Sequence, residues 1–135
     1  MTDIFTKKKR SQIMSRITGR NTFPELSLRK ALYSLGIRYR LHDRHLPGHP
    51  DIVVRRLKTA IFVNGCFWHQ HKNCKRSTIP KTNKKYWLPK LKRNIEKQAD
   101  DFRKLRKEGW KIAVVWECQT KNKNTLESKL RKIFL

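Results

Sequence analysis

Residues 47–69 have the sequence PGHPDIVVRRLKTAIFVNGCFWH, and their pattern predicts the centre of the fold. Two apolar runs of strand length, 51–54 and 59–63, follow a Pro-Gly-x-Pro loop and are separated by a short polar link. Runs this apolar are typical of strands that are buried on both faces. We therefore expect two central strands whose pairing places Asp51 near Val63.

Upstream of this stretch, the sequence predicts a basic arm, a helix and a half-buried strand. Residues 7–20 are basic, and we expect a mobile arm leading into a short helix capped by Ser11, with a solvated charge run as the alternative. Thr22-Phe23-Pro24-Glu25 forms a capping box with proline in the first turn, so a helix begins here, and Gly36 ends it. Residues 37–41 alternate in polarity, as a half-buried strand does.

Downstream, the segment 65–83 is irregular and crowded with histidine, cysteine and aromatic residues, so its order must come from something other than hydrophobic burial. A long helix follows, and we expect it to begin near residues 86–88 because Pro89 suits only a first turn. Gly109 ends this helix, and residues 110–117 read as a further buried strand. The expected apolar positions of the two remaining helices are Leu91, Ile95, Phe102 and Leu105 in the long helix, and Leu126, Leu130, Ile133 and Phe134 in a short terminal one.

The predicted order of elements is α-β-β-β-α-β-α, with no internal repeat and no linker, which indicates a single α/β domain. A chain of 135 residues is the size of one ordinary domain. We expect a basic N-terminal arm and short helix over 1–20, followed by a single domain over 21–135.

Lysine and arginine number 34 against 10 acidic residues, a formal net charge of +24. Nucleic acid is the obvious partner, because each phosphate that the protein neutralises releases counterions. A membrane surface is the rival, but the longest apolar run, 112–116, is far too short to span a bilayer, and the N-terminus lacks the apolar region of a secretory signal. We expect a soluble cytoplasmic protein with no membrane partner. A ribosomal-type basic protein would carry the same charge, and composition alone leaves that alternative open.

All three cysteines fall into one candidate metal site. Cys66, His71 and Cys74 lie within nine residues, and Cys118 sits at the end of the last predicted strand. Three thiolates and an imidazole are a ligand set that zinc favours in a closed tetrahedron. A closed site leaves no position for water, so the zinc is expected to be structural and to staple 65–83 to that strand. The alternative is three small buried cysteines and a surface histidine.

Asp51 opens an apolar strand, where a carboxylate is either a turn cap or a metal ligand held on a rigid element. Together with a backbone carbonyl it suits Mg²⁺, which binds few protein ligands and keeps several waters. The ion polarises a phosphate and helps to form hydroxide. His69 is the candidate acceptor for the proton of the attacking water, or else a surface histidine with no role. Glu25 either reaches the water shell of the metal or serves only its capping box.

Three segments resemble the very-short-patch repair (Vsr) endonucleases: PGHPD at 47–51, VNGCFWH at 63–69, and Gly109-Trp110 with VWEC at 115–118. The similarity covers roughly residues 8–120, in order. It implies a restriction-endonuclease-like fold of the PD-(D/E)XK type, with a mixed central sheet flanked by helices, one structural zinc and a Mg²⁺-dependent active site.

The same resemblance implies an activity and its partners. The expected substrate is double-stranded DNA with a T:G mispair, left when 5-methylcytosine deaminates. One strand is nicked 5′ to the mismatched T, which initiates very-short-patch repair. The expected associates are a cytosine-5 DNA methyltransferase and downstream repair proteins, and we expect the protein to be a monomer.

Carried over residue by residue, the resemblance makes Asp51 the metal-binding carboxylate and the carbonyl of Val63 the second Mg²⁺ contact. His69 becomes the general base, and Glu25 a contributor through water. The zinc ligands become Cys66, His71, Cys74 and Cys118.

Two positions depart from the pattern of the family. Asn64 stands where some members carry histidine, which puts any proton-donating role at this catalytic position in question. The segment 94–98 keeps Asn94, expected at the DNA surface, but has Gln98 where many relatives have an aspartate. Glu96 and Asp100 are candidates to replace that acid from an adjacent turn.

Aromatic residues that unstack a base step make binding depend on how easily that step opens, and a mispair opens at lower cost. The resemblance implies that Phe67, Trp68 and Trp87 intercalate from the major-groove side and that Met14 presses in from the minor groove. Ordinary packing over the zinc, or at the helix start, is the alternative for these rings. The basic residues Lys7, Lys8, Lys9 and Arg10 are expected to clamp phosphates.

Two rival functions remain open at this point. A zinc-containing nucleic-acid-binding protein without catalysis explains the charge, the aromatics and the zinc, but gives no reason for Asp51 at a strand head. A related restriction endonuclease would cut a fixed sequence on both strands.

Overall fold

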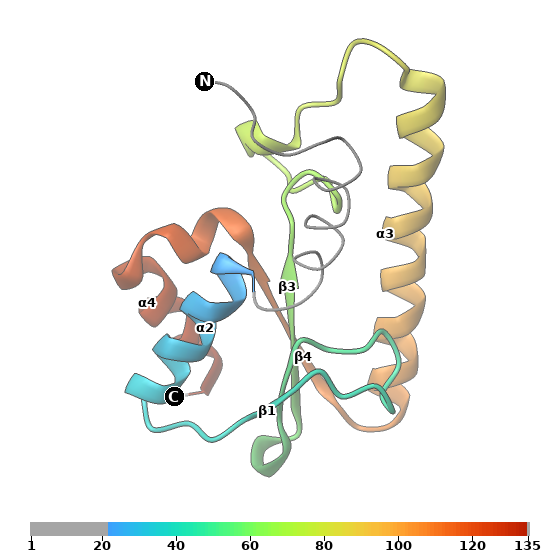
Figure 1. Cartoon of the computed structure of the whole chain (residues 1–135). Helices are drawn as coiled ribbons and strands as arrows, with labels where there is room; N and C mark the ends of the chain where they lie inside the picture. Colours follow the sequence, from blue (N-terminus) through green and yellow to red (C-terminus); the bar gives the residue numbers. More distant parts are fainter. Residues whose placement is uncertain (1–21, 135) are drawn as a thin grey trace, which may run out of the picture.

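The computed structural model describes residues 22–134, which fold into a mixed four-stranded sheet with helices on both faces. Figure 1 shows α3 on one side of the sheet and α2 with α4 on the other. The elements in chain order are α2 (Phe23–Ser34), β1 (Arg40–Leu41), β2 (Ile52–Val54), η1 (Arg55–Leu57), β3 (Thr59–Asn64), η2 (Lys75–Ser77), α3 (Lys84–Lys107), β4 (Lys111–Trp116), η3 (Glu117–Lys121) and α4 (Lys123–Phe134). The order of helices and strands predicted from residue 22 onward is confirmed.

The strands lie in the order β1-β2-β3-β4. β1, β2 and β3 pair antiparallel, whereas β3 and β4 pair parallel. The parallel pairing arises because α3 carries the chain back to the end of the sheet at which β3 begins. The start of β2 therefore lies at the same end of the sheet as the ends of β3 and β4. This end bears the candidate site.

Alternation along β3 divides the core between the two faces of the sheet. Ile61 packs with α2 and α4, in a cluster that includes Leu28, Leu32 and Leu130. On the opposite face, Ala60 and Phe62 pack against Leu105 of α3. The partly buried residues around this cluster are Leu46, Phe102, Trp110 and Ile112. Both 52–54 and 59–62 are buried, so the prediction of two central strands is confirmed.

The helix α2 begins as the sequence predicts. The hydroxyl of Thr22 accepts a hydrogen bond from the backbone N–H of Glu25, and Pro24 lies in the first turn. Gly36 follows the helix at φ +74°, a conformation that favours glycine and turns the chain towards the sheet.

Three expectations for the ordered elements are wrong in detail. Only Arg40 and Leu41 of the expected strand 37–41 pair with β2, because Ile37 and Tyr39 pack against the core beside α2 instead. The long helix begins at Lys84, so Pro89 lies inside it. Its turn is exposed, so water can solvate the carbonyl that proline leaves without an N–H partner. Ile95 is 43% exposed and does not belong to the buried face.

Within residues 22–134, no helix combines the length and apolar character needed to cross a membrane. The predicted short helix capped by Ser11 lies outside the described residues.

Candidate active site and metal centres

A pocket of about 430 Å³ opens where β2 begins and β3 ends, against one side of α3. Ligand sites in open α/β sheets commonly lie beyond the carboxyl ends of the strands. The sequence-predicted residues that line this pocket are Asp51, Val63, Asn64, Trp68, His69 and Asn94. The structure therefore brings together candidates from the residue before β2, from β3, from the loop that follows β3, and from α3.

Asp51 lies directly beside Val63, as the pairing of two central strands predicts. Its Oδ2 accepts a hydrogen bond of 2.7 Å from the backbone N–H of Val63. In an antiparallel pair the N–H and C=O of one residue face the same neighbour, so the carbonyl of Val63 faces this side as well. A carboxylate and a carbonyl on two rigid strands are donors that a hard cation accepts.

Burial raises the pKa of Asp51 from 3.8 to about 6, although the hydrogen bond from Val63 lowers it. The carboxylate of Glu25 raises this pKa further, and His42 opposes that effect. Desolvation disfavours the ionised carboxylate, and a bound cation would favour it. The electrostatics of Asp51 thus suit a group that is ionised when it holds a metal.

Glu25 lies in a cluster with Asp51 and His42, and the sequence did not indicate His42. Glu25 is 2% exposed, and its Oε1 lies 2.8 Å from Nε2 of His42 and 2.5 Å from a guanidinium nitrogen of Arg29. The candidate ligand atoms of Glu25, His42 and Asp51 all lie within 4.8 Å of one another. The carboxylate therefore takes part in this cluster, beyond any role at the start of α2.

His69 follows the zinc-ligand candidate Cys66 and lines the same pocket as Asp51. Burial lowers the pKa of His69. Its Nδ1 is buried and has no hydrogen-bond partner among the described residues. A buried nitrogen of this kind costs free energy, which favours a functional role over that of an idle surface histidine. A neutral imidazole in this pocket is chemically able to accept a proton.

The two departures from the family pattern meet in one contact. The side-chain amides of Asn64 and Gln98 donate to each other at 2.9 and 2.8 Å. The structure does not support Glu96 or Asp100 as a replacement for the missing acid, because both are exposed and pair with lysine or arginine on α3. Asp101, which the sequence did not indicate, is the acid of α3 that lines the pocket.

Cys66, His71, Cys74 and Cys118 converge as predicted, with all four ligand atoms within 4.8 Å of one another. Nδ1 of His71 lies 3.7 Å from Sγ of Cys66 and 3.5 Å from Sγ of Cys118. Zinc bonds of about 2.3 Å to sulfur and about 2.0 Å to nitrogen at a tetrahedral angle separate the two ligands by roughly 3.5 Å. The donor set and its spacing therefore fit zinc.

The surroundings of these ligands support a metal. Burial raises the pKa of Cys66 to about 12, so a thiolate there requires a cation beside it. A backbone hydrogen bond from Arg76 lowers the pKa of Cys74. The ring of His71 stacks on Trp116 at 4.1 Å between centroids, with 8° between the planes. The strand end that leads to Cys118 thus fixes the orientation of the imidazole.

The predicted wedge residues form one aromatic group at the edge of the pocket. Ring centroids of Phe67, Trp68 and Trp87 lie 5.3 to 5.8 Å apart, and Trp68 is 42% exposed. Tyr86 extends the group, and the ammonium of Lys90 lies over the rings of Trp68 and Tyr86. Trp68 is exposed and Phe67 and Trp87 are half-buried, so none of the three rings belongs to the buried core.

Met14, Lys7, Lys8, Lys9 and Arg10 lie outside the described residues, so their predicted contacts with DNA remain predictions.

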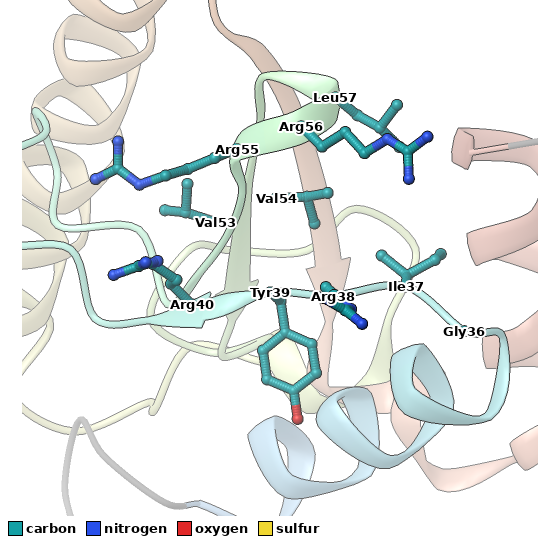
Figure 2. A pocket seen from close by; sticks show the side chains of 10 residues that line it. All are labelled: Gly36, Ile37, Arg38, Tyr39, Arg40, Val53, Val54, Arg55, Arg56 and Leu57. Atoms are coloured by element: carbon teal, nitrogen blue, oxygen red, sulfur yellow. The ribbon is translucent and has the colours of Figure 1, made fainter.

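A second pocket, of about 860 Å³, lies at the opposite end of the sheet between residues 36–40 and 53–57. Its rim carries Arg38, Arg40, Arg55 and Arg56. Figure 2 shows the guanidinium groups of Arg55 and Arg56 pointing to opposite sides, and Arg55 pairs with Asp43 at 2.8 Å. The predicted catalytic residues Asp51 and His69 line the first pocket and not this one, so this pocket is not the candidate active site.

Comparison with known proteins gives a family match and several similar relatives. A family model described as DNA mismatch endonuclease Vsr matches residues 2–76. The chain is also 37% identical over 126 residues to the DNA mismatch endonuclease Vsr of Escherichia coli, covering 93% of this chain and 80% of that protein.

Two further relatives are described as nicking enzymes. The chain is 44% identical to the type II nicking enzyme V.NmeAIP of Neisseria meningitidis, over 98% of this chain and 94% of that one. It is 41% identical to the type II nicking enzyme V.XorIIP of Xanthomonas oryzae, over 98% and 97% of the two chains.

Proposed function

This chain belongs to the Vsr family of DNA mismatch endonucleases, and we propose that it nicks one strand of duplex DNA 5′ to the T of a T:G mispair. Such a mispair forms when 5-methylcytosine deaminates, and the nick would initiate very-short-patch repair. The observation that carries the proposal is the placement of Asp51, Val63 and His69 in one pocket beside an accessible aromatic group.

The carboxylate of Asp51 and the carbonyl of Val63 would hold Mg²⁺ at the head of the pocket. When bound there, the ion polarises the scissile phosphate and lowers the pKa of a water. Two features support the assignment: the donors lie on adjacent strands, and Asp51 is buried where an ionised carboxylate gains most from a cation. Glu25, within 4.8 Å of Asp51, would orient metal-bound water without touching the metal.

His69 would accept the proton of the attacking water as general base. Burial lowers the pKa of His69 and so favours the neutral imidazole, and a base must be neutral to accept a proton. Asn64 would act as a binding residue and not as a proton donor, because its side-chain amide is hydrogen-bonded to Gln98 and does not titrate. Asn94, in the same pocket, offers an amide to the DNA.

The Cys66, His71, Cys74 and Cys118 set would hold one structural zinc per chain. Four protein ligands leave no open position for water or substrate, so this metal orders the loop and does not act on the phosphate. The loop between the first two ligands carries the rings of Phe67 and Trp68.

The rings of Phe67, Trp68 and Trp87 would enter the duplex from the major-groove side, with Met14 opposite them. The rings can stack only on base faces that are exposed when a base step opens. Stacking therefore stabilises only DNA whose bases have been separated, which favours the mispair. Lys7, Lys8, Lys9 and Arg10 would bind phosphates on either kind of duplex.

We propose that the domain has a restriction-endonuclease-like fold. The support is a mixed sheet flanked by helices, with the proposed metal carboxylate at the head of a strand. The proposed partners beyond DNA are a cytosine-5 DNA methyltransferase, whose product creates the substrate, and downstream repair proteins. A monomer fits a reaction that cuts one strand.

A plasmid assay tests the proposed function. The purified protein is incubated with Mg²⁺ and three closed circles, which are matched, carry a single T:G mispair, or carry a single A:C mispair. We expect open circles only from the T:G substrate, with the nick mapped 5′ to the T. Linear product from matched DNA would instead indicate a restriction endonuclease. Binding without any cleavage would indicate a non-catalytic nucleic-acid-binding protein.

A further inference from the structure

His42 connects the helix that carries Glu25 to the strand that carries Asp51. Its Nε2 lies 2.8 Å from Oε1 of Glu25, and its backbone N–H donates a 3.0 Å hydrogen bond to the carbonyl of Asp51. One residue therefore contacts both carboxylate residues, one through its side chain and one through its backbone. Glu25 and Asp51 belong to different parts of the fold, because Glu25 lies in α2 and Asp51 immediately precedes β2.

Arg29 contacts both Glu25 and His42, because its guanidinium pairs with Glu25 and one of its nitrogens lies 3.3 Å from Nε2 of His42, but Arg29 itself belongs to α2. It lies four residues further along α2, so its ion pair with Glu25 moves with the helix. His42 comes from the segment that follows β1 and precedes the turn into β2. A shift of α2 relative to the sheet would leave the Arg29 pair intact and break the His42 pair.

The backbone at His42 is held in a conformation that has to be maintained by its surroundings. Its φ is +48°, in the left-handed region that residues other than glycine adopt at a cost. That conformation lets the N–H face Asp51 while the imidazole turns to Glu25. Costly conformations of this kind cluster at sites where geometry matters for function.

We propose that His42 is a positioning residue for the nicking reaction, because it fixes the separation between the side chain of Glu25 and the metal-binding strand head at Asp51. The inference rests on the proposed function, in which Asp51 holds the catalytic cation and Glu25 orients its waters. A divalent cation with few protein ligands keeps several waters, and outer carboxylates set how those waters point. Glu25 performs that task only if it stays at a constant distance from Asp51.

The competing explanation is that the contact between Glu25 and His42 merely stabilises the fold. The two roles predict different behaviour for two amide variants. In His42→Asn the amide is too short to reach Glu25, and asparagine accepts the left-handed backbone readily. In His42→Gln the terminal N–H reaches about as far as Nε2 of histidine. His45→Asn, at an exposed position three residues further on, is the matched control.

Three measurements on the full chain decide between them: the single-turnover nicking rate on a T:G duplex at saturating Mg²⁺, Mn²⁺ binding without DNA followed by electron paramagnetic resonance, and the thermal midpoint. We expect His42→Asn to lose about 10- to 100-fold in rate and to bind Mn²⁺ more weakly, as for loss of an outer-shell partner. His42→Gln is expected to recover both to within a few-fold, and His45→Asn to match the wild type.

A double-mutant cycle that combines His42→Asn with Glu25→Gln completes the test. If His42 acts through Glu25, adding His42→Asn to Glu25→Gln lowers the rate little further. The proposal is overturned if His42→Asn lowers only the thermal midpoint, if His42→Gln is as impaired as His42→Asn, or if the two substitutions are additive. Failure of the proposed function would look different: the wild type would not nick the T:G duplex, while the Mn²⁺ titrations would still report whether His42 organises the site.

Discussion

Asn64 and Gln98 exchange two hydrogen bonds through their side-chain amides, at 2.9 and 2.8 Å, and so join the end of β3 to the middle of α3. Asn64 is 3% exposed, so the contact lies in the wall of the candidate active site. Each amide satisfies one donor and one acceptor of the other. A change at either position therefore leaves buried polar groups without partners.

This pairing predicts strong coupling between the two residues. Asn64→Ala and Gln98→Ala should each lower the free energy of unfolding by about 1–3 kcal/mol, because each leaves the remaining amide without its hydrogen-bond partner. The double variant should lose less than the two single losses combined, with a coupling of about 0.5–3 kcal/mol. Urea denaturation of the four proteins measures it. Additive losses would show that the amides stabilise the fold separately.

The raised pKa of Asp51 predicts how stability depends on pH. An acid whose pKa rises on folding, from 3.8 to about 6, binds its proton more tightly in the folded chain. The wild type should therefore lose stability as pH rises from about 4 to about 7, by on the order of 3 kcal/mol, whereas Asp51→Asn should not. Thermal midpoints in the presence of a chelator measure the difference, with the exposed Asp100→Asn as control. Parallel curves for wild type and Asp51→Asn would contradict the assignment.

Nicking should depend on Asp51 and His69 to different degrees. Asp51→Ala removes the one side-chain ligand proposed for Mg²⁺ and should abolish nicking, while affinity for the T:G duplex stays within several-fold. His69→Ala removes a general base and should lower the rate by about 10²- to 10⁴-fold. Single-turnover rates and binding titrations on the same duplex separate the two effects. Nicking by Asp51→Ala at a rate near that of the wild type would reduce Asp51 to a turn cap.

The zinc site should contribute to folding as well as to activity. We expect one tightly bound zinc per chain after washing with a chelator, measured by elemental analysis. Cys118→Ser should lower the thermal midpoint markedly, because the free energy of metal binding at such a site is free energy of folding. A washed protein that contains no zinc and keeps its midpoint would contradict this expectation.

The aromatic group and the basic arm should differ in specificity. Trp68→Ala removes stacking worth roughly 1–3 kcal/mol, so affinity for the T:G duplex should fall by about 5- to 150-fold while affinity for matched DNA hardly changes. Neutralising Lys7, Lys8, Lys9 and Arg10 together should weaken binding to both duplexes and flatten its salt dependence. Paired titrations at one salt concentration measure both effects. Equal losses on the two duplexes for Trp68→Ala would assign that ring to packing alone.

The parts of the site that the sequence predicted are those fixed by local patterns. Asp51 and Val63 meet because two adjacent apolar runs pair as neighbouring strands, and the turn between them sets the register. Cys118 reaches the other zinc-ligand candidates because β4 lies parallel to β3 and both strands end at the same level. Periodicity and chain order are sufficient to derive both relationships.

The parts that escaped prediction depend on three-dimensional placement. His42 reaches Glu25 only because β1 ends after two residues and the next backbone turns left-handed, and no spacing in the sequence indicates either feature. The Asn64–Gln98 contact spans 34 positions and requires the rotation of α3 about its axis to be known. Ile95 fits the apolar periodicity of α3, yet it is 43% exposed, and periodicity alone does not say which apolar residue of a helix finds a packing partner.

Phe67, Trp68 and His69 are three consecutive residues enclosed between the metal-ligand candidates Cys66 and His71. In the proposed reaction, two of them detect the mispair and the third acts at the phosphate to be cut. The distance between the mispair and the nick is then set by a short covalent segment, whose two ends are held together by the metal. An insertion or deletion within 67–70 would change that distance. The nick would then move along the strand or no longer depend on the mispair, even where every other residue of the site is kept.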